Sequence, residues 1–223
     1  MKRAWVIWMI ITLLFVGCGG KPTPIWVSNA TSRLEQFKKE FLGGRMDVAE
    51  MNFNLALSEI KKSGDLEILG RAYLTKMALE AAILRPLKVD DFLALQKASP
   101  SSVNANYYAF LQGRMREVDV KFIPEVYGKF VNAWDKEGAN MVEVIRVIDH
   151  PVSRLIACGI YTGRRGDEEG VLLLAVETAS HEGWKRALSI YLERLASLYE
   201  RKGEQEAAKK IRTRLSIIGP VKD

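Results

Sequence analysis

The sequence predicts an all-α protein. From Thr31 onward, apolar residues recur every three or four positions, which is the spacing that places them on one face of a helix. The breaks in this pattern fall at short glycine-bearing turns, and short turns between amphipathic helices indicate antiparallel helical hairpins. A chain of 223 residues with 48% apolar and 27% charged residues can bury a full core in one or two domains.

The N-terminus has the pattern of an export signal. Lys2 and Arg3 precede an unbroken apolar run over 4–16, which Gly17-Cys18 follows. This run is too short to span a bilayer comfortably, so residues 1–17 are predicted to be a cleaved signal peptide. The stretch Phe15-Val16-Gly17-Cys18 resembles a bacterial lipobox, with Phe15 where family members usually have leucine.

The lipobox resemblance implies cleavage before Cys18 and a diacylglycerol group on its thiol, which would anchor the protein in the cell envelope. Gly19 and Gly20 follow without the aspartate that resembles an inner-membrane retention signal, which favours the outer membrane, facing the periplasm. Export excludes nucleic acid as a partner, in spite of the net charge of +6. Cys158 would be the one free cysteine left, so no internal disulfide is expected.

Residues 18–30 are predicted to be a flexible tether, because 19–29 are rich in glycine and proline and lack a helical period. An α-helical repeat-like domain is expected over 31–220. Its first three apolar stripes are Leu34, Phe37 and Phe41; Met51, Leu55 and Ile60 beside Ala49, Phe53 and Ala56; and Leu66, Leu69, Tyr73, Leu74 and Met77. Turns between helices are expected at 43–44, 63–65, 163–166, 182–183 and 202–203.

The middle of the chain predicts further helices over 90–98, 105–115 and 123–134. Residues 141–148 are β-branched and partly alternate in polarity, so a strand is an alternative there. We predict a helix for this segment, because its neighbours are helical and a lone strand would have no partner.

Two parts of the chain resemble the tetratricopeptide repeat. The matching spacings are Leu66-x2-Leu69-Gly70-x2-Tyr73, Ala49-x3-Phe53-x2-Ala56, Leu192-x2-Leu195-Ala196-x2-Tyr199 and, more weakly, Ala157-Cys158-x2-Tyr161. The small residue of the signature lets two helices approach closely, and the tyrosine fills the space one turn further on. The resemblance covers 31–84 and 151–220, and implies a tetratricopeptide-repeat-like helical-hairpin solenoid with a concave protein-binding groove.

Candidate partner-binding residues come from an aromatic-rich middle and from a basic pair. Core packing is the favoured role of the aromatic residues, and those left exposed would form a binding groove. Gly163-Arg164-Arg165-Gly166 is interpreted as an inter-helix turn with Asp167 as the next N-cap, and its arginines as contacts for an anionic polymer or lipid. The candidates are Tyr107, Tyr108, Tyr127, Trp134, Arg164 and Arg165.

The sequence has none of the usual catalytic motifs, neither a Gly-x-Ser-x-Gly elbow, nor a cysteine cluster, nor His-Glu-x-x-His. Glu177 and His181 lie four residues apart, but two ligands do not make a metal site, and His181 is interpreted as a helix-end residue. Cys158 is interpreted as a small packing residue. We therefore expect no catalytic residue, no metal and no cofactor.

These observations predict a non-catalytic, membrane-anchored scaffold or assembly factor for a secretion, pilus or outer-membrane complex. Its partners would be envelope proteins or peptide segments, and its lipid would hold it to the membrane. One alternative is a cell-wall-active enzyme of peptidoglycan turnover on a helical scaffold, which requires a protonated carboxylate in an apolar cleft. Another is a lipid or small-molecule carrier, for which tight hairpin stacking leaves little room.

Overall fold

The computed structural model describes residues 24–220, and all regular structure in this range is helical. The predicted all-α class is therefore confirmed for these residues. The α-helices are α2 (Ile25–Gly43), α3 (Met46–Lys61), α4 (Leu66–Ala82), α5 (Asp90–Ala98), α6 (Ser102–Leu111), α7 (Gly128–Ala133), α8 (Met141–Arg146), α9 (Pro151–Arg165), α10 (Glu169–His181), α11 (Lys185–Lys202) and α12 (Gln205–Ile218). Between α6 and α7 lie three 3-10 turns, η2 (Met115–Glu117), η3 (Val120–Phe122) and η4 (Glu125–Tyr127).

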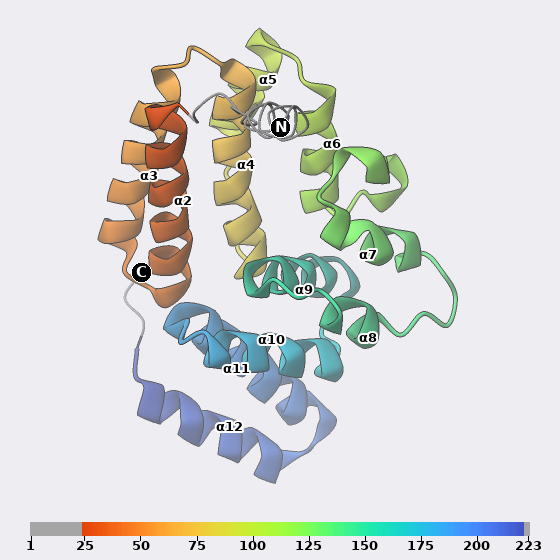
Figure 1. Ribbon diagram of the computed structural model, residues 1–223. Helices are drawn as coiled ribbons and strands as arrows, with labels where there is room; N and C mark the ends of the chain where they lie inside the picture. Colours follow the sequence, from red (N-terminus) through yellow and green to blue (C-terminus); the bar gives the residue numbers. More distant parts are fainter. Residues whose placement is uncertain (1–23, 221–223) are drawn as a thin grey trace, which may run out of the picture.

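Consecutive helices pack in pairs. α2 lies along α3, and α9, α10, α11 and α12 follow one another, each packed against the next. Figure 1 shows α2 and α3 side by side at one end of the molecule and α12 at the other end. α4 joins the two halves of the fold, because it contacts α5 and α6 as well as α9.

α2 begins earlier than the sequence predicts. Its first residue is Ile25, so the tether predicted over 18–30 is wrong for residues 25–30, and residues 18–23 lie outside the described range. Ala30 is buried and Trp26 packs against the core. Such contacts explain the early start, because tertiary packing stabilises helical turns that show no apolar period of their own. The signal peptide over 1–17 and the lipidation of Cys18 also fall outside the described residues.

The predicted apolar stripes locate most of the core. Phe37, Phe53 and Met77 are among the buried residues. Met51, Leu55 and Leu66 are exceptions, because their exposed fractions are 52%, 39% and 39%. The buried face of α3 consists of Ala49, Asn52, Phe53, Ala56, Leu57 and Ile60. Met51 and Leu55 lie beside this face rather than on it, so the predicted stripe matches the buried face only in part.

Side-chain caps set the start of several helices. The Asp65 carboxylate accepts a hydrogen bond of 3.0 Å from the backbone N–H of Ile68 at the start of α4. The Asn140 side chain accepts one of 3.2 Å from the N–H of Glu143, which starts α8. The helix predicted over 141–148 is thereby confirmed for its first six residues, and the strand alternative is wrong.

Three further predicted boundaries differ from the structure. The helix expected over 105–115 is α6, which begins and ends earlier, at Ser102 and Leu111. α9 continues through Arg165, so the turn expected at 163–166 begins only at Gly166, and Arg164 and Arg165 are helical. The helix expected over 123–134 is divided into η4 and the short α7. Ile123 precedes Pro124 and is extended, with φ −117° and ψ 161°, because the proline ring disfavours the helical conformation in the residue before it.

α4 and α9 cross at Gly159. Among the described glycines, Gly159 lies closest to the backbone of another helix. A Cβ atom added at Gly159 would lie 2.1 Å from the carbonyl oxygen of Ala81. Beside this contact, the Tyr191 hydroxyl donates a hydrogen bond of 2.8 Å to the carbonyl of Ala82. The neighbouring Cys158 is fully buried, as expected for a packing residue, and burial raises the pKa of its thiol to about 12. The close approach itself, however, depends on Gly159.

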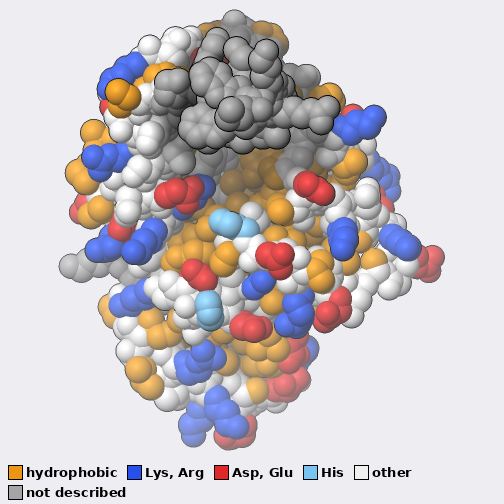
Figure 2. Space-filling view, viewed as in Figure 1, with side chains coloured by type: hydrophobic (Ala, Val, Ile, Leu, Met, Phe, Trp, Pro, Cys, Tyr) orange, Lys and Arg blue, Asp and Glu red, His pale blue; other side chains and the backbone are white. Residues whose placement is uncertain are grey.

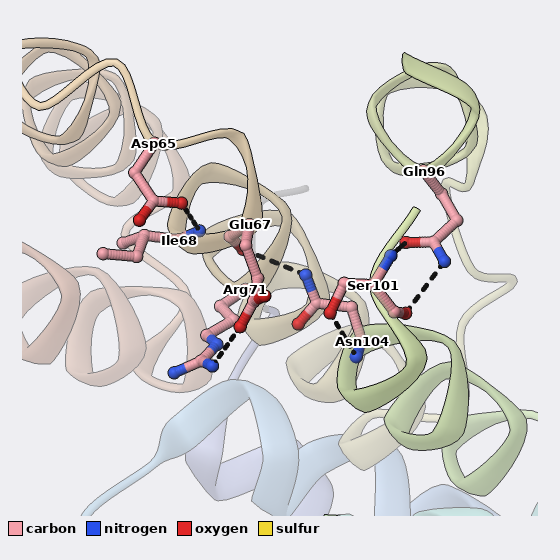
Figure 3. Close-up of polar contacts among 7 residues, drawn as sticks. All are labelled: Asp65, Glu67, Ile68, Arg71, Gln96, Ser101 and Asn104. Atoms are coloured by element: carbon pink, nitrogen blue, oxygen red, sulfur yellow. Dashed lines mark hydrogen bonds and ion pairs between the residues drawn. The ribbon is translucent and has the colours of Figure 1, made fainter. Parts of the chain in front are cut away.

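α4 also meets α6, at Gly70. A Cβ atom there would lie 2.9 Å from the Nδ2 atom of Asn104, and this amide donates a hydrogen bond of 2.9 Å to the carbonyl of Glu67. Figure 3 shows this contact, with Ser101 capping α6 and the Gln96 amide donating to the Ser101 carbonyl over 2.9 Å. Gly70, the small residue of the repeat-like spacing in α4, therefore leaves room for the polar side chain of Asn104 from α6.

Candidate functional site

A pocket of about 400 Å³ lies where η2, the segment after α7 and the last turn of α9 meet. It is lined by Gly113, Arg114, Met115, Arg116, Glu117, Trp134, Asp135, Arg164 and Arg165. We call it the arginine pocket. Four guanidinium groups face two carboxylates here, so the lining carries an excess of positive charge, which attracts anions.

The end of α6 brings two of the arginines to this pocket. Gly113 follows the helix with a φ of +68°, a conformation that favours glycine, and the chain then turns into η2 with Arg114 and Arg116. A Cβ atom at Gly113 would lie 2.5 Å from the Cγ atom of Arg164. The absence of a side chain at Gly113 thus allows the aliphatic part of Arg164 to pack against the turn.

Asp135 joins two arginines from distant parts of the chain. Its carboxylate contacts the Arg116 Nε atom at 2.9 Å and the Arg165 Nη2 atom at 2.7 Å. Hydrogen bonding to Arg116, followed by hydrogen bonding to Arg165, lowers the pKa of Asp135. Asp135 therefore stays ionised at neutral pH and holds the two guanidinium groups in place.

Trp134 forms the aromatic wall of the arginine pocket. The Arg165 guanidinium lies 4.9 Å from the centre of the indole ring and donates a hydrogen bond of 2.9 Å to the Trp134 carbonyl. The indole also packs edge-on against Phe130 and Tyr161, with ring centres 5.3 and 6.0 Å apart. These contacts fix the orientation of the ring without burying it completely.

Arg164 differs from the other three arginines. Among residues 24–220 it has neither a hydrogen bond nor an ion pair, and its side chain is exposed. It also lines a second pocket of about 400 Å³, which we call the α4–α9 pocket. That pocket is lined by Ala81, Leu84, Arg85, Pro86, Leu87, Leu111, Gly159, Ile160, Thr162, Gly163, Arg164 and Arg194.

A third pocket, of about 490 Å³, lies between α4, α6 and residues 121–124, and we call it the apolar pocket. Figure 2 shows hydrophobic side chains gathered in the hollow between α4 and α6. Leu74 contributes from α4, Tyr107 from α6, and Phe122 and Ile123 from the connecting segment. Arg71 and Lys121 supply the positive charge of this lining.

The six residues proposed from the sequence are divided among these environments. Trp134, Arg164 and Arg165 meet in the arginine pocket, whereas Tyr107 lines the apolar pocket. Tyr108 packs against Phe92 and accepts a hydrogen bond of 2.7 Å from the Gln112 amide. Tyr127 has an exposed fraction of 2%, so the structure contradicts its proposed contact with a partner. Burial raises the pKa of the Tyr127 hydroxyl to about 12.

Sequence reasoning missed Arg114, Arg116 and Asp135. The run Gly113-Arg114-Met115-Arg116 was visible as a basic cluster after a glycine, but it lies about fifty residues from Arg164. Periodicity within a segment carries no information on which distant segments meet. Asp167 was predicted to cap α10, but its carboxylate instead contacts Arg194 and Arg201 at 2.7 and 2.6 Å.

The structure places the histidine and the buried carboxyl group that bear on metal and acid–base chemistry. Within 24–220, no group of three or more His, Cys, Asp or Glu residues is placed to hold a metal ion, and His181 contacts Glu182 at 2.9 Å. Burial raises the pKa of the Glu80 carboxyl group, which accepts a hydrogen bond of 2.8 Å from the Lys88 N–H. Glu80 lines none of the three pockets.

None of the helices described over 24–220 is long and apolar enough to cross a membrane. No family model, no curated protein and no solved structure matches the chain.

Proposed function

We propose that this protein is a lipid-anchored envelope scaffold, which binds a partner protein as an assembly factor for a secretion, pilus or outer-membrane complex. In this proposal the signal peptide over 1–17 is removed and Cys18 carries the lipid. The body then faces the periplasm from the outer membrane. The helical framework positions the binding surface and performs no catalysis.

The observation that carries the proposal is the composition of the arginine pocket. Trp134, Arg164 and Arg165 were singled out from the sequence, and they line one pocket with Arg114 and Arg116. Tryptophan and arginine are enriched among the residues that dominate protein–protein binding energies. A rigid indole surrounded by guanidinium groups suits recognition of a protein segment better than it suits bond-breaking chemistry.

The consecutive packing of α9 to α12 supports a repeat-like scaffold. Leu192, Leu195 and Ala196, the spacing that resembles the tetratricopeptide repeat, are all fully buried in α11. Tyr199 donates a hydrogen bond of 3.0 Å to Glu169 of α10, and α12 packs along α11. We include a tetratricopeptide-repeat-like solenoid in the proposal for this part of the chain, by analogy with the family.

The early start of α2 limits how far the scaffold can stand from the membrane. Six residues lie between Cys18 and Ile25, so seven Cα-to-Cα steps join them, and each step spans at most about 3.6 Å in an extended chain. The lipid would therefore hold the start of α2 within about 25 Å of the membrane surface. Because α12 lies at the other end of the molecule (Figure 1), it would face away from the membrane.

The anchor can be tested with Cys18→Ser. The serine cannot carry the thioether-linked lipid, so we expect the protein to move from the membrane pellet to the soluble fraction of osmotically lysed cells. Cys158→Ser is the matched control, because this buried thiol should leave the membrane fraction unchanged. Continued pelleting of the Cys18 variant with the membrane would contradict lipid anchoring.

The binding function can be tested by photo-crosslinking in living cells. A benzoylphenylalanine residue at Arg116, whose side chain is 88% exposed in the arginine pocket, should give a discrete cross-linked protein on immunoblots. The same residue at Lys210, exposed on α12, should give none of that product. Absence of a product from position 116, or the same product from both positions, would argue against a partner at this pocket.

A further inference from the structure

The arginine pocket and the α4–α9 pocket meet at a shared residue. Arg164 lines both, from the last turn of α9. We call these two neighbouring pockets together the arginine groove. Trp134 and Arg116 line the first pocket, and Arg85 and Arg194 line the second.

Arginines outnumber carboxylates in the lining of both pockets. The lining of the arginine groove contains six arginines but only two carboxylates, those of Glu117 and Asp135. Ion pairs with Glu117, Asp135 and Asp167 engage Arg114, Arg116, Arg165 and Arg194. Arg164, in the middle, has no such partner within 24–220, so its five N–H donors are available to an incoming acceptor.

The groove is also partly apolar. Leu84, Pro86, Leu87 and Leu111 line the α4–α9 pocket, and Met115 and Trp134 line the arginine pocket. A compact anion such as phosphate would use the guanidinium groups and leave these apolar surfaces in water. An extended peptide would use both, because its acidic and small apolar side chains can alternate along the chain.

From these observations we propose that the arginine groove binds an extended acidic segment of the partner protein, with Arg164 as the central contact for a carboxylate. Arginine and carboxylate groups match in shape, because two parallel N–H donors can meet two oxygens. Loss of hydration at a partly apolar groove strengthens this pairing relative to a pair in open solvent. The inference rests on the proposed scaffold function and specifies the chemistry of its partner.

A binding experiment with defined peptides tests the inference. The full-length protein in detergent would be titrated into a fluorescein-labelled decapeptide of alternating glutamate and alanine, and fluorescence anisotropy recorded. We expect saturable binding that Arg164→Glu weakens by about tenfold or more, because the variant replaces attraction by repulsion. The matched control is Arg214→Glu on α12, another exposed arginine that lacks a polar partner within 24–220, and it should change the affinity by less than about twofold.

Several results would overturn the inference. Equal weakening by Arg164→Glu and Arg214→Glu would mean that overall charge attracts the peptide. Equal binding of a glutamine–alanine decapeptide would remove the role of carboxylates. Displacement by inorganic phosphate at the peptide's own concentration would identify a site for compact anions.

If Arg164→Glu lowered the melting temperature, the peptide affinities of Arg164→Gln and Arg214→Gln would be compared instead.

The partner experiment separates this inference from the scaffold function. Combined with benzoylphenylalanine at position 116, Arg164→Glu should abolish the cross-linked product. If the product persists, the acidic-segment inference fails while the scaffold function stands. If benzoylphenylalanine at position 116 gives no product even when Arg164 is unchanged, the scaffold function itself fails.

Discussion

Gly159→Ala is expected to lower the free energy of unfolding by about 3 kcal/mol, at the upper end of the cost of overpacking. The added methyl group would lie 2.1 Å from the carbonyl oxygen of Ala81 and 2.8 Å from the Cα atom of Ala82. Both atoms belong to the backbone of α4, so the clash cannot be relieved by rotating a side chain. α4 and α9 would have to separate, which loosens the contact that joins the two halves of the fold.

Gly163→Ala is the matched control for this prediction. It lies one turn further along the same helix, and a Cβ atom there meets nothing within 4 Å. Alanine favours the helix over glycine, so this variant should be unchanged or more stable by up to about 1 kcal/mol. Urea denaturation followed by circular dichroism compares the two variants directly. Equal stability would show that α4 and α9 do not cross as closely as described.

Phe110→Ala is expected to cost about 3–5 kcal/mol, because it removes a fully buried aromatic ring and leaves a cavity. Phe110 lies between the rings of Tyr107, Tyr127 and Phe130, with ring centres 5.6, 4.6 and 6.1 Å away. The chain of aromatic contacts continues from Phe130 to Trp134. The substitution should therefore also loosen Trp134, and weaken binding at the arginine pocket under conditions where the protein remains folded.

Phe122→Ala provides the comparison for Phe110→Ala. The same ring is removed, but Phe122 has an exposed fraction of 46%, so we expect a loss of about 1 kcal/mol or less. Thermal denaturation of the two variants measures the difference. Similar losses at the two positions would contradict the assignment of Phe110 to the core of the aromatic cluster.

The sequence predicted the features that depend on neighbouring residues. Helical periodicity located the buried residues Phe37, Phe53 and Met77, and glycine-bearing turns separated most helices where expected. It failed at 25–30, where contacts of Ala30 and Trp26 with the core extend α2 through a segment without apolar period. It also matched the buried face of α3 only in part, at Met51 and Leu55, because a local pattern cannot show which side of a helix a distant neighbour covers.

Three of the nine residues that line the arginine pocket were predicted from the sequence. Trp134, Arg164 and Arg165 were selected by residue type, and the structure brings them together. Arg116 was missed, because nothing in its own segment indicates that η2 packs beside the last turn of α9. Tyr127 was selected wrongly, because an aromatic residue in a helical pattern suits a binding surface and a core equally well until its neighbours are known.

The sequence by itself determined the all-α class and the approximate helix boundaries, because each depends on residues close together in the chain. The export signal and the lipidation of Cys18 stay predictions. Only the tertiary structure decided that Arg116 and Arg165 share Asp135, that Arg164 is left without a polar partner within 24–220, and that Gly159 fits against α4. These features arise where helices far apart in sequence pack together, and their side-chain shapes and charges interact only after the chain has folded.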